Sequence, residues 1–255
     1  MKESRKGPKI LLGILIFLSS IGIVYTLVQI GIWLWDNHKL SEEMKEIAFS
    51  ATVTTIKEKA QEETVSFLEV DFSELEKIND EVVAWVSIPE TNIDYPVVQH
   101  SDNDYYLDHS FNRSKNGAGW VFMDYHNKRE EQDRNVVLYA HARKDGSMFG
   151  TLKNVLTSQW LENEENHIIK MSTKNENSLW QIFSVYRVPE VTDYIQTEFA
   201  NDEQFQNFLD TIQQRSFYDF NTTLDGEDRV LTFSTCYNSK ERLVVHAKLV
   251  NTMKK

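Results

Sequence analysis

The sequence is poor in the residues that define several specialised classes of protein. Its 255 residues include one cysteine, four prolines and nine glycines. One cysteine cannot form an intrachain disulfide, and so little glycine and proline excludes collagen-like and low-complexity chains. Basic residues are outnumbered, at 27 Lys and Arg against 39 Asp and Glu. Because binding to phosphates requires a basic patch, nucleic acid is not an expected partner.

Motifs for metals and cofactors are also missing. The sequence contains no CxxC, HExxH or EF-hand spacing and no glycine-rich phosphate loop. We therefore expect no metal and no cofactor. The length allows one domain or two small ones.

One long apolar run stands near the N-terminus. Residues Ile10–Trp35 carry no charge over 26 positions, more than the roughly 20 residues with which a helix crosses a bilayer core. We predict an uncleaved signal anchor over residues 10–35. A cleavable signal peptide is the alternative, but its apolar region spans about 7 to 15 residues before a small-residue cleavage site. This run instead continues to Trp33 and Trp35, which suit a membrane interface.

The flanking charges predict the orientation of this span. Four bases and one acid lie in residues 1–9, the predicted cytoplasmic tail, so the positive-inside rule places the remainder of the chain outside the cell. Removing these from the total leaves 23 bases and 38 acids, a net charge of -15 for the exported part. The expected protein is anchored once in the cell membrane and has an acidic extracellular domain.

Residues 36–78 are predicted to form helices. Ser41–Leu68 contains no Gly or Pro, and apolar residues recur at helical spacing after a possible N-cap at Ser41. A shorter helix, capped by Ser73, is expected to follow. We therefore predict a helical stalk between the membrane span and the rest of the chain.

From residue 79 to residue 255 the pattern changes to short β-rich runs with a period of two. Eight strands within about 170 residues predict a mainly β fold, a closed or nearly closed barrel. The predicted strands are Val82–Ile88, Ile93–Gln99, Gly119–Met123, Val136–Ala140, His167–Ser172, Leu179–Val188, Arg229–Cys236 and Arg242–Val250.

One helix is predicted as an insertion before the strand that holds the cysteine. Asn201 and Gln204 resemble a capping pair. An apolar stripe then recurs at helical spacing, and we expect it to face the core. The stripe consists of Phe205, Phe208, Leu209 and Ile212.

The lone cysteine, Cys236, is either a buried apolar residue or a free reactive thiol. Five residues separate it from Arg242, which suits a hairpin loop between the last two strands. A register symmetric about that loop pairs Cys236 with Arg242, Ser234 with Val244, and Thr232 with His246.

A guanidinium opposite a thiol has a chemical consequence. Directly opposed residues have Cβ atoms about 4.5 to 5.5 Å apart. Arg242 would then favour the thiolate of Cys236 and could stabilise the oxyanion formed when that thiolate attacks an amide. The alternative is a solvated Arg242 paired with Glu241.

Acyl transfer by a cysteine also requires an acid for the departing amine, and histidine is the usual one. His141 is the best candidate among seven histidines, because it follows the apolar run ending at Ala140 and opens a polar loop. His246 lies four residues along the strand from Arg242, roughly 13 Å at 3.3 Å per residue, too far to serve. His38 lies beside the predicted membrane span. Simple exposed or locally bonded imidazoles are expected at His100, His109, His126 and His167.

A family resemblance is carried by the motifs Leu231–Cys236, Arg242–Leu249, Asn135–Leu152, Asp102–Leu107, Gly119–Asp124 and Asp145–Phe149, and by the helix inserted before the cysteine strand. These motifs resemble those of class B sortases, the membrane-anchored cysteine transpeptidases of Gram-positive bacteria. The similarity covers about Asn79 to Leu249. The resemblance implies a sortase-like closed eight-stranded β-barrel behind one transmembrane helix.

The resemblance also implies roles for particular residues. Cys236 would attack the Thr carbonyl of a C-terminal sorting signal on a secreted surface protein, His141 would protonate the leaving amine, and Arg242 would hold the substrate and stabilise the oxyanion. The amine of a cell-wall precursor of the lipid II type would then resolve the thioester. The sorting-signal groove would be lined by Asn103, Leu107, Thr192, Tyr194, Ile195 and Ser234.

Three features depart from the class B pattern. Phe233 stands where Leu is more usual, the loop from Cys236 to Arg242 is short, and Tyr237 replaces an acid after the cysteine. The loop and Tyr237 bear on substrate preference.

Two alternatives to a cell-wall transpeptidase remain open. A pilin-polymerising sortase commonly has a lid and a second, C-terminal span, which this sequence lacks. A catalytically silent binding or assembly module predicts the loss of Cys236, His141 or Arg242, and all three are present.

Overall fold

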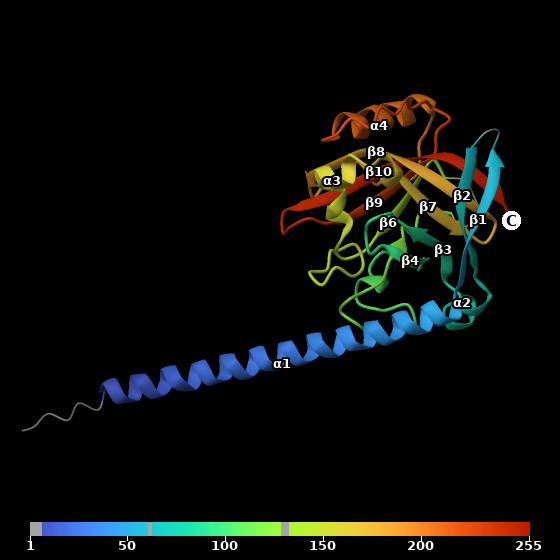
Figure 1. Cartoon of the computed structure of the whole chain (residues 1–255). Coiled ribbons are helices and arrows are strands. Elements are labelled where there is room, and N and C mark those ends of the chain that lie inside the picture. Colours follow the sequence, from blue (N-terminus) through green and yellow to red (C-terminus); the bar gives the residue numbers. More distant parts are fainter. Residues whose placement is uncertain (1–6, 61–62, 129–132) are drawn as a thin grey trace, which may run out of the picture. The chain divides into compact units, whose positions relative to one another are not determined.

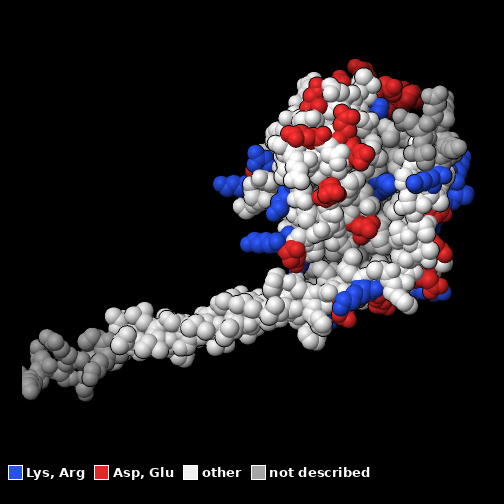
Figure 2. Space-filling model, viewed as in Figure 1, with Lys and Arg blue, Asp and Glu red and all other residues white. Residues whose placement is uncertain are grey.

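The computed structural model describes residues 7–60, 63–128 and 133–255, and the chain divides into two compact units, residues 1–42 and 43–255. The first unit contains the N-terminal part of helix α1 (Gly7–Ser50). Within the described residues, α1 is the one helix long and apolar enough to cross a membrane. Figure 2 shows the apolar stretch of α1 without charged side chains on the visible face.

Three hydroxyl groups inside the apolar stretch of α1 are satisfied locally. Ser19, Ser20 and Thr26 each donate a hydrogen bond of 2.8 Å to the carbonyl four residues earlier. A polar group in lipid without such a partner costs several kcal/mol, so these bonds make the segment compatible with a bilayer core. The expected apolar helix over residues 10–35 is present as a candidate membrane span.

The helix predicted over Ser41–Leu68 is wrong beyond Ser50. Helix α1 runs through Ser41 without a break, and an antiparallel hairpin follows, made of β1 (Thr52–Ala60) and β2 (Glu63–Asp71). The run Thr-Val-Thr-Thr-Ile at residues 52–56 explains the difference, because β-branched side chains lose rotamer freedom in a helix and favour strands. An absence of Gly and Pro does not by itself specify a helix.

Strand β2 is attached to the rest of its unit by buried side chains and polar contacts. Phe67 and Val70 are buried. The amide of Val70 donates to Ser172 Oγ (3.3 Å), and Asn177 Nδ2 donates to Glu69 Oε2 (2.8 Å). The hairpin is therefore part of the packed unit and not a helical stalk.

Eight strands form the predicted closed barrel, in the order β10-β8-β7-β3-β4-β5-β6-β9, with β9 pairing again with β10 (Figure 1). Each of the eight predicted runs overlaps one of them, and only the ends differ. The strands are β3 (Val82–Ser87), β4 (Asp94–Val98), β5 (Phe122–Met123), β6 (Asn135–Tyr139), β7 (Ile168–Thr173), β8 (Glu176–Pro189), β9 (Val230–Cys236) and β10 (Glu241–Lys254).

Two of the strand pairs are parallel, and one of them matters for function. Strand β6 runs parallel to β9, with Tyr139 opposite Ser234. Both chains therefore leave the barrel at the same edge, with His141 two residues beyond Tyr139 and Cys236 two residues beyond Ser234. Because neighbouring strands lie about 4.8 Å apart, this pairing brings the two residues to one place despite their separation in sequence.

The inserted helix is α4 (Asp202–Gln214), and its cap is as predicted. The amide of Gln204 donates to Asn201 Oδ1 (2.9 Å), while Gln204 Oε1 accepts from the amide of Ala200 (2.6 Å). Figure 1 shows α4 lying next to β8 and β10. Its apolar stripe packs against buried residues of β8, β9 and β10. The cluster contains Phe183, Tyr186, Tyr194, Phe205, Phe208, Leu209, Ile212, Val230 and Val244.

Short helices connect the strands. Helix α2 begins at Ser73, but Phe72 occupies the cap position without a side-chain hydrogen bond, and Asp71 Oδ1 accepts from the amide of Ser73 (2.9 Å). Ser73 is therefore not the cap that the sequence predicts. The short helices are α2 (Ser73–Ile78), η1 (Tyr105–Leu107), η2 (Leu152–Leu156), α3 (Ser158–Leu161) and η3 (Glu164–His167).

A buried histidine links three strands under α4. His246 is fully buried, and burial lowers its pKa to about 3, with a smaller contribution from the charge of Arg215. The hydroxyl of Thr232 donates to Asn135 Oδ1 (2.6 Å), so His246 Nδ1 must be the donor to Thr232 (2.8 Å). His246 Nε2 then accepts from the hydroxyl of Tyr186 (2.9 Å). The imidazole is neutral, with its proton on Nδ1.

The low pKa of His246 predicts that the folded protein is less stable in acid. Unfolded His246 takes up a proton below pH 6.5, whereas the folded protein excludes that proton until about pH 3. Stability is therefore full above pH 6.5 and falls as the pH drops toward 3, with about 2 kcal/mol lost at pH 5. Urea unfolding of the full chain in detergent at pH 7 and pH 5 measures this loss.

The matched variant is His246→Gln, which removes the titrating group. We expect it to be less stable than the parent at pH 7 and to show a smaller change between pH 7 and pH 5. An equal change in both proteins would show that His246 does not cause the acid sensitivity.

Candidate functional site

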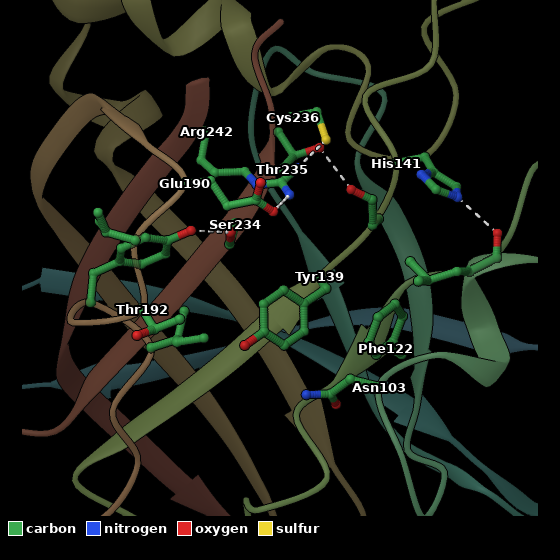
Figure 3. A pocket seen from close by; sticks show the side chains of 15 residues that line it. Asn103, Phe122, Tyr139, His141, Glu190, Thr192, Ser234, Thr235, Cys236 and Arg242 are labelled. Atoms are coloured by element: carbon green, nitrogen blue, oxygen red, sulfur yellow. Dashed lines mark hydrogen bonds and ion pairs between the residues drawn. The ribbon is translucent and has the colours of Figure 1, made fainter. Parts of the chain in front are cut away.

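A pocket of about 480 Å³ opens where β6 and β9 end (Figure 3). All nine site residues predicted from the sequence line it, although they come from five separate parts of the chain. These are Asn103, Leu107, His141, Thr192, Tyr194, Ile195, Ser234, Cys236 and Arg242. Sequence reasoning did not single out the other lining residues, Phe122, Tyr139, Ala140, Glu190, Val191 and Thr235.

The β9–β10 hairpin has the predicted register. Cys236 lies opposite Arg242, Ser234 opposite Val244, and Thr232 opposite His246. The thiol of Cys236 is exposed, so the interpretation of this residue as a buried apolar side chain is wrong.

Arg242 holds two partners at once. Its Nη1 donates to Cys236 Sγ, and its Nη2 donates to Glu190 Oε1. The alternative pairing with Glu241 is not found among the described contacts, because the Glu241 carboxylate accepts from Asn238 Nδ2 (2.7 Å). A guanidinium beside a thiol favours the thiolate, which is the nucleophilic form.

His141 is oriented by a main-chain carbonyl. Its Nε2 lies 2.8 Å from the carbonyl oxygen of Leu107, and since a carbonyl can only accept, Nε2 carries a proton. In Figure 3 the other ring nitrogen, Nδ1, lies on the side of the ring that faces Cys236. A neutral His141 can therefore take a proton at Nδ1, and the charged ring can donate one there.

The loop after His141 is fixed by its own polar groups. Arg143 Nη2 donates to Asp145 Oδ2 (2.8 Å), and Ser147 Oγ donates to Asp145 Oδ1 (2.6 Å). Burial acts to raise the pKa of Asp145, but these two partners outweigh it and lower the pKa to about 2. The amide of Phe149 donates to the carbonyl of His141 (3.0 Å) and closes the loop. His141 thus stands on a rigid support.

A buried carboxylate organises the pocket beneath Asn103. Asp124 is 2% exposed and accepts from the Tyr139 hydroxyl (2.8 Å) and from Asn103 Nδ2 (2.9 Å). The amide of Tyr125 donates to Asn103 Oδ1 (3.1 Å), so both ends of the Asn103 amide are held. Burial, followed by the charge of Asp124, raises the pKa of Tyr139. Tyr139 is two residues before His141, and this spacing is the one feature of the sequence that could indicate Tyr139 as a pocket residue.

Tyr194 anchors the opposite wall. Its hydroxyl shares a hydrogen bond with Ser234 Oγ (3.0 Å), and burial raises its pKa. Asn135 Nδ2 donates to the carbonyls of Gln196 (2.9 Å) and Tyr194 (3.4 Å). The buried network of His246 therefore extends to the segment after β8 that lines the pocket.

Comparisons with known proteins agree with this geometry. The sequence profile of the Sortase domain matches residues 86–250, which include Cys236, His141 and Arg242. The chain belongs to the sortase family. Sortase B of Listeria monocytogenes is 34% identical over 242 residues, which cover 91% of this chain and 98% of that relative.

Solved structures of sortase B have the same fold. The sortase B of B. anthracis in complex with AAEK1 has a TM-score of 0.73 and 36% identity, covering 86% of this chain and 99% of that chain. The Staphylococcus aureus sortase B-substrate complex has a TM-score of 0.66 and 34% identity, covering 71% and 84%. The predicted class, B, and the predicted enzyme type, a cysteine transpeptidase, are confirmed.

The other histidines of this sortase lie outside the pocket. Among the described residues, no three His, Cys, Asp or Glu side chains are grouped so that they could hold a metal ion. Apart from His246, His167 is the one buried histidine in the described part of the chain, and its Nε2 donates to the carbonyl of Leu161 (3.0 Å). His100 Nδ1 lies 2.8 Å from Glu81 Oε1, and His126 Nδ1 lies 2.8 Å from Asp124 Oδ1.

Gly119 gives a direct test of how His141 is positioned. It has a φ of +63°, and a Cβ there would lie 2.6 Å from the Tyr106 carbonyl oxygen, 2.9 Å from that of Leu107 and 3.1 Å from His141 Cδ2. We expect Gly119→Ala to displace the acceptor of His141, to lower the melting temperature and to slow alkylation of Cys236 by iodoacetamide at neutral pH several-fold.

The control is Gly226→Ala, because nothing lies within 4 Å of a Cβ at that position. It is expected to change neither quantity. Parent-like melting and alkylation in Gly119→Ala would show that this backbone does not hold His141 in place.

Proposed function

We propose that this chain is a membrane-anchored transpeptidase that joins secreted surface proteins to a cell-wall precursor. The main support for the proposal is that the exposed Cys236 sulfur accepts a hydrogen bond from Arg242, in a pocket that His141 also lines. A nucleophile, a cationic donor and an acid–base group then meet in one cavity, as acyl transfer requires.

In the acylation step, the Cys236 thiolate attacks the carbonyl carbon of the Thr in a sorting signal. The carbonyl oxygen becomes an oxyanion, which the guanidinium of Arg242 stabilises. His141, charged at this stage, gives the Nδ1 proton to the amine as the peptide bond breaks. The products are a thioester on Cys236 and the free C-terminal fragment.

The second step resolves the thioester. An acceptor amine gives a proton to neutral His141 and attacks the thioester carbonyl, and collapse of the intermediate forms an amide and frees the thiolate. We assign the acceptor as the amine of a lipid II-type precursor. Two relatives support this scheme, the S. aureus sortase B-substrate complex and a sortase B complexed with triglycine.

The sorting signal is proposed to lie along the pocket wall. Leu107 and Ile195 offer apolar contact, while Asn103, Thr192 and Ser234 offer polar groups, with Tyr194 fixing the position of Ser234 through its hydroxyl. The pocket is large enough for several peptide side chains.

The proposed topology follows the charge pattern of the N-terminus. Residues 1–9 form a cytoplasmic tail, residues 10–35 a single membrane span, and residues 79–255 the extracellular catalytic barrel. Residues 36–78 connect the membrane span to the barrel along the chain and contain the end of α1, the β1–β2 hairpin and α2. The partners are then the membrane, the secreted substrates and the wall precursor.

Product analysis tests the activity. The full chain in detergent is incubated with peptides that hold Thr at the scissile bond and differ before it, with and without triglycine. We expect cleavage after Thr for at least one peptide and an amide product with triglycine. The control, Cys236→Ala, is expected to give neither. Equal turnover by Cys236→Ala would contradict the proposal, and binding without turnover by the parent would favour a silent module.

Arg242→Lys tests the role of the guanidinium. A lysine is a point charge with a flexible stem and cannot donate to Sγ and to Glu190 as a planar fork does. We expect a loss of at least about 100-fold in kcat/KM, the scale for removing an oxyanion donor. Parent-like turnover in Arg242→Ala would show that this residue does not take part.

A further inference from the structure

Glu190 occupies a distinctive place at the mouth of the pocket. It is the first residue after β8, whose last residue, Pro189, pairs with Glu241 of β10. It therefore lies beside Arg242 from the neighbouring strand. Among the described residues that line the pocket, Glu190 is the one acidic side chain.

Glu190 holds one end of the Arg242 guanidinium through a hydrogen bond. The Nη2 end of the guanidinium donates to Glu190, and the Nη1 end donates to Cys236 Sγ (Figure 3). A guanidinium is planar and rigid, so fixing Nη2 also fixes the direction of Nη1. The side chain of Arg242 is 29% exposed and that of Glu190 is 77% exposed, so the carboxylate reaches the guanidinium from the solvent side.

Among the described contacts, Glu190 is the one carboxylate that accepts a hydrogen bond from the Arg242 guanidinium. The residue after the cysteine is Tyr237, and its ring lies against the guanidinium of Arg187, 4.7 Å from the ring centre to the central carbon. The carboxylate of Glu241, next to Arg242 in sequence, accepts from Asn238. The acid that orients Arg242 thus comes from the end of β8 and not from the β9–β10 hairpin.

We propose that Glu190 is a positioning residue that aims the Arg242 guanidinium at Cys236 for acyl transfer. The inference rests on the proposed function where it concerns acylation. The orientation of Arg242 toward the thiol stands independently of that function.

The charge of Glu190 acts in the opposite sense to its hydrogen bond. The titratable and charged groups that line the pocket with Cys236 are Arg242 from β10, Glu190 after β8, Tyr139 of β6, His141 after β6, and Tyr194. The carboxylate offsets part of the positive charge that favours the thiolate, while its hydrogen bond keeps the guanidinium in place. Charge and orientation can therefore be separated by substitution.

Three variants of the full chain in detergent separate these effects. Glu190→Ala removes both the charge and the acceptor, and Glu190→Gln removes the charge but keeps an oxygen that can accept from Nη2. The matched control is Glu241→Gln, which makes the same charge change on a carboxylate that accepts from Asn238 instead of the guanidinium.

Two measurements are made on each variant. Acylation by a peptide found to be a substrate is followed in single turnovers to obtain a rate and a KM. The rate of Cys236 alkylation by iodoacetamide is followed from pH 5 to pH 10, which needs no peptide.

We expect Glu190→Ala to acylate about fivefold more slowly with KM within twofold, the scale of one partly exposed ion pair. Glu190→Gln is expected to recover to within twofold of the parent. Its alkylation midpoint is expected to move to lower pH by about 0.5 unit, because a negative charge beside the thiolate is gone while the guanidinium stays in place. Glu241→Gln is expected to match the parent in both measurements.

Parent-like acylation and alkylation by Glu190→Ala would overturn the proposal. So would a Glu190→Gln variant as slow as Glu190→Ala, because the retained acceptor would then have no effect. If none of the peptides acylates the parent protein, the proposed function fails. The alkylation profiles alone then test the role of Glu190. An alkylation midpoint that is lower in Glu190→Gln than in Glu190→Ala supports positioning by Glu190, because both variants lack the charge and only Glu190→Gln keeps an acceptor for Nη2. Identical profiles in these two variants refute it.

Discussion

The site depends on the parallel pairing of β6 with β9. Tyr139 opposite Ser234 fixes where both strands leave the barrel, so that His141 and Cys236 emerge side by side from segments about a hundred residues apart in sequence. Parallel neighbours must be joined by a long crossover, and here the crossover contains β7, β8 and α4. The barrel closes only if that crossover packs, so the chemistry at one edge relies on the folding of the whole unit.

A second layer of contacts makes the edge rigid. The antiparallel β9–β10 hairpin presents Arg242 to Cys236, the carbonyl of Leu107 orients His141, and Asp124 holds the Asn103 amide. Each group is fixed by a neighbour with a defined direction, so little rearrangement is needed when charge develops during the reaction. The buried network of His246 extends the same principle to the wall that carries Tyr194.

Much of this arrangement could be predicted from the sequence, because it is encoded locally. The five-residue loop gives the register of Cys236 and Arg242, and alternating apolar residues locate all eight strands. The β1–β2 hairpin is harder to predict, because its alternation of apolar and polar residues is weak and a segment without Gly or Pro is also compatible with a helix. Glu190 and Asp124 could not be predicted as partners, since their contacts depend on which strands become neighbours in the closed barrel.

The central claim is that Cys236 becomes covalently acylated by a peptide cut after Thr. Intact mass spectrometry of the full chain, quenched during turnover of a substrate peptide, measures this directly. The account predicts a mass gain equal to the peptide truncated after its Thr, located on Cys236 and lost when an amine is added. Turnover without an adduct at any time, or an adduct that persists in Cys236→Ala, would contradict the account.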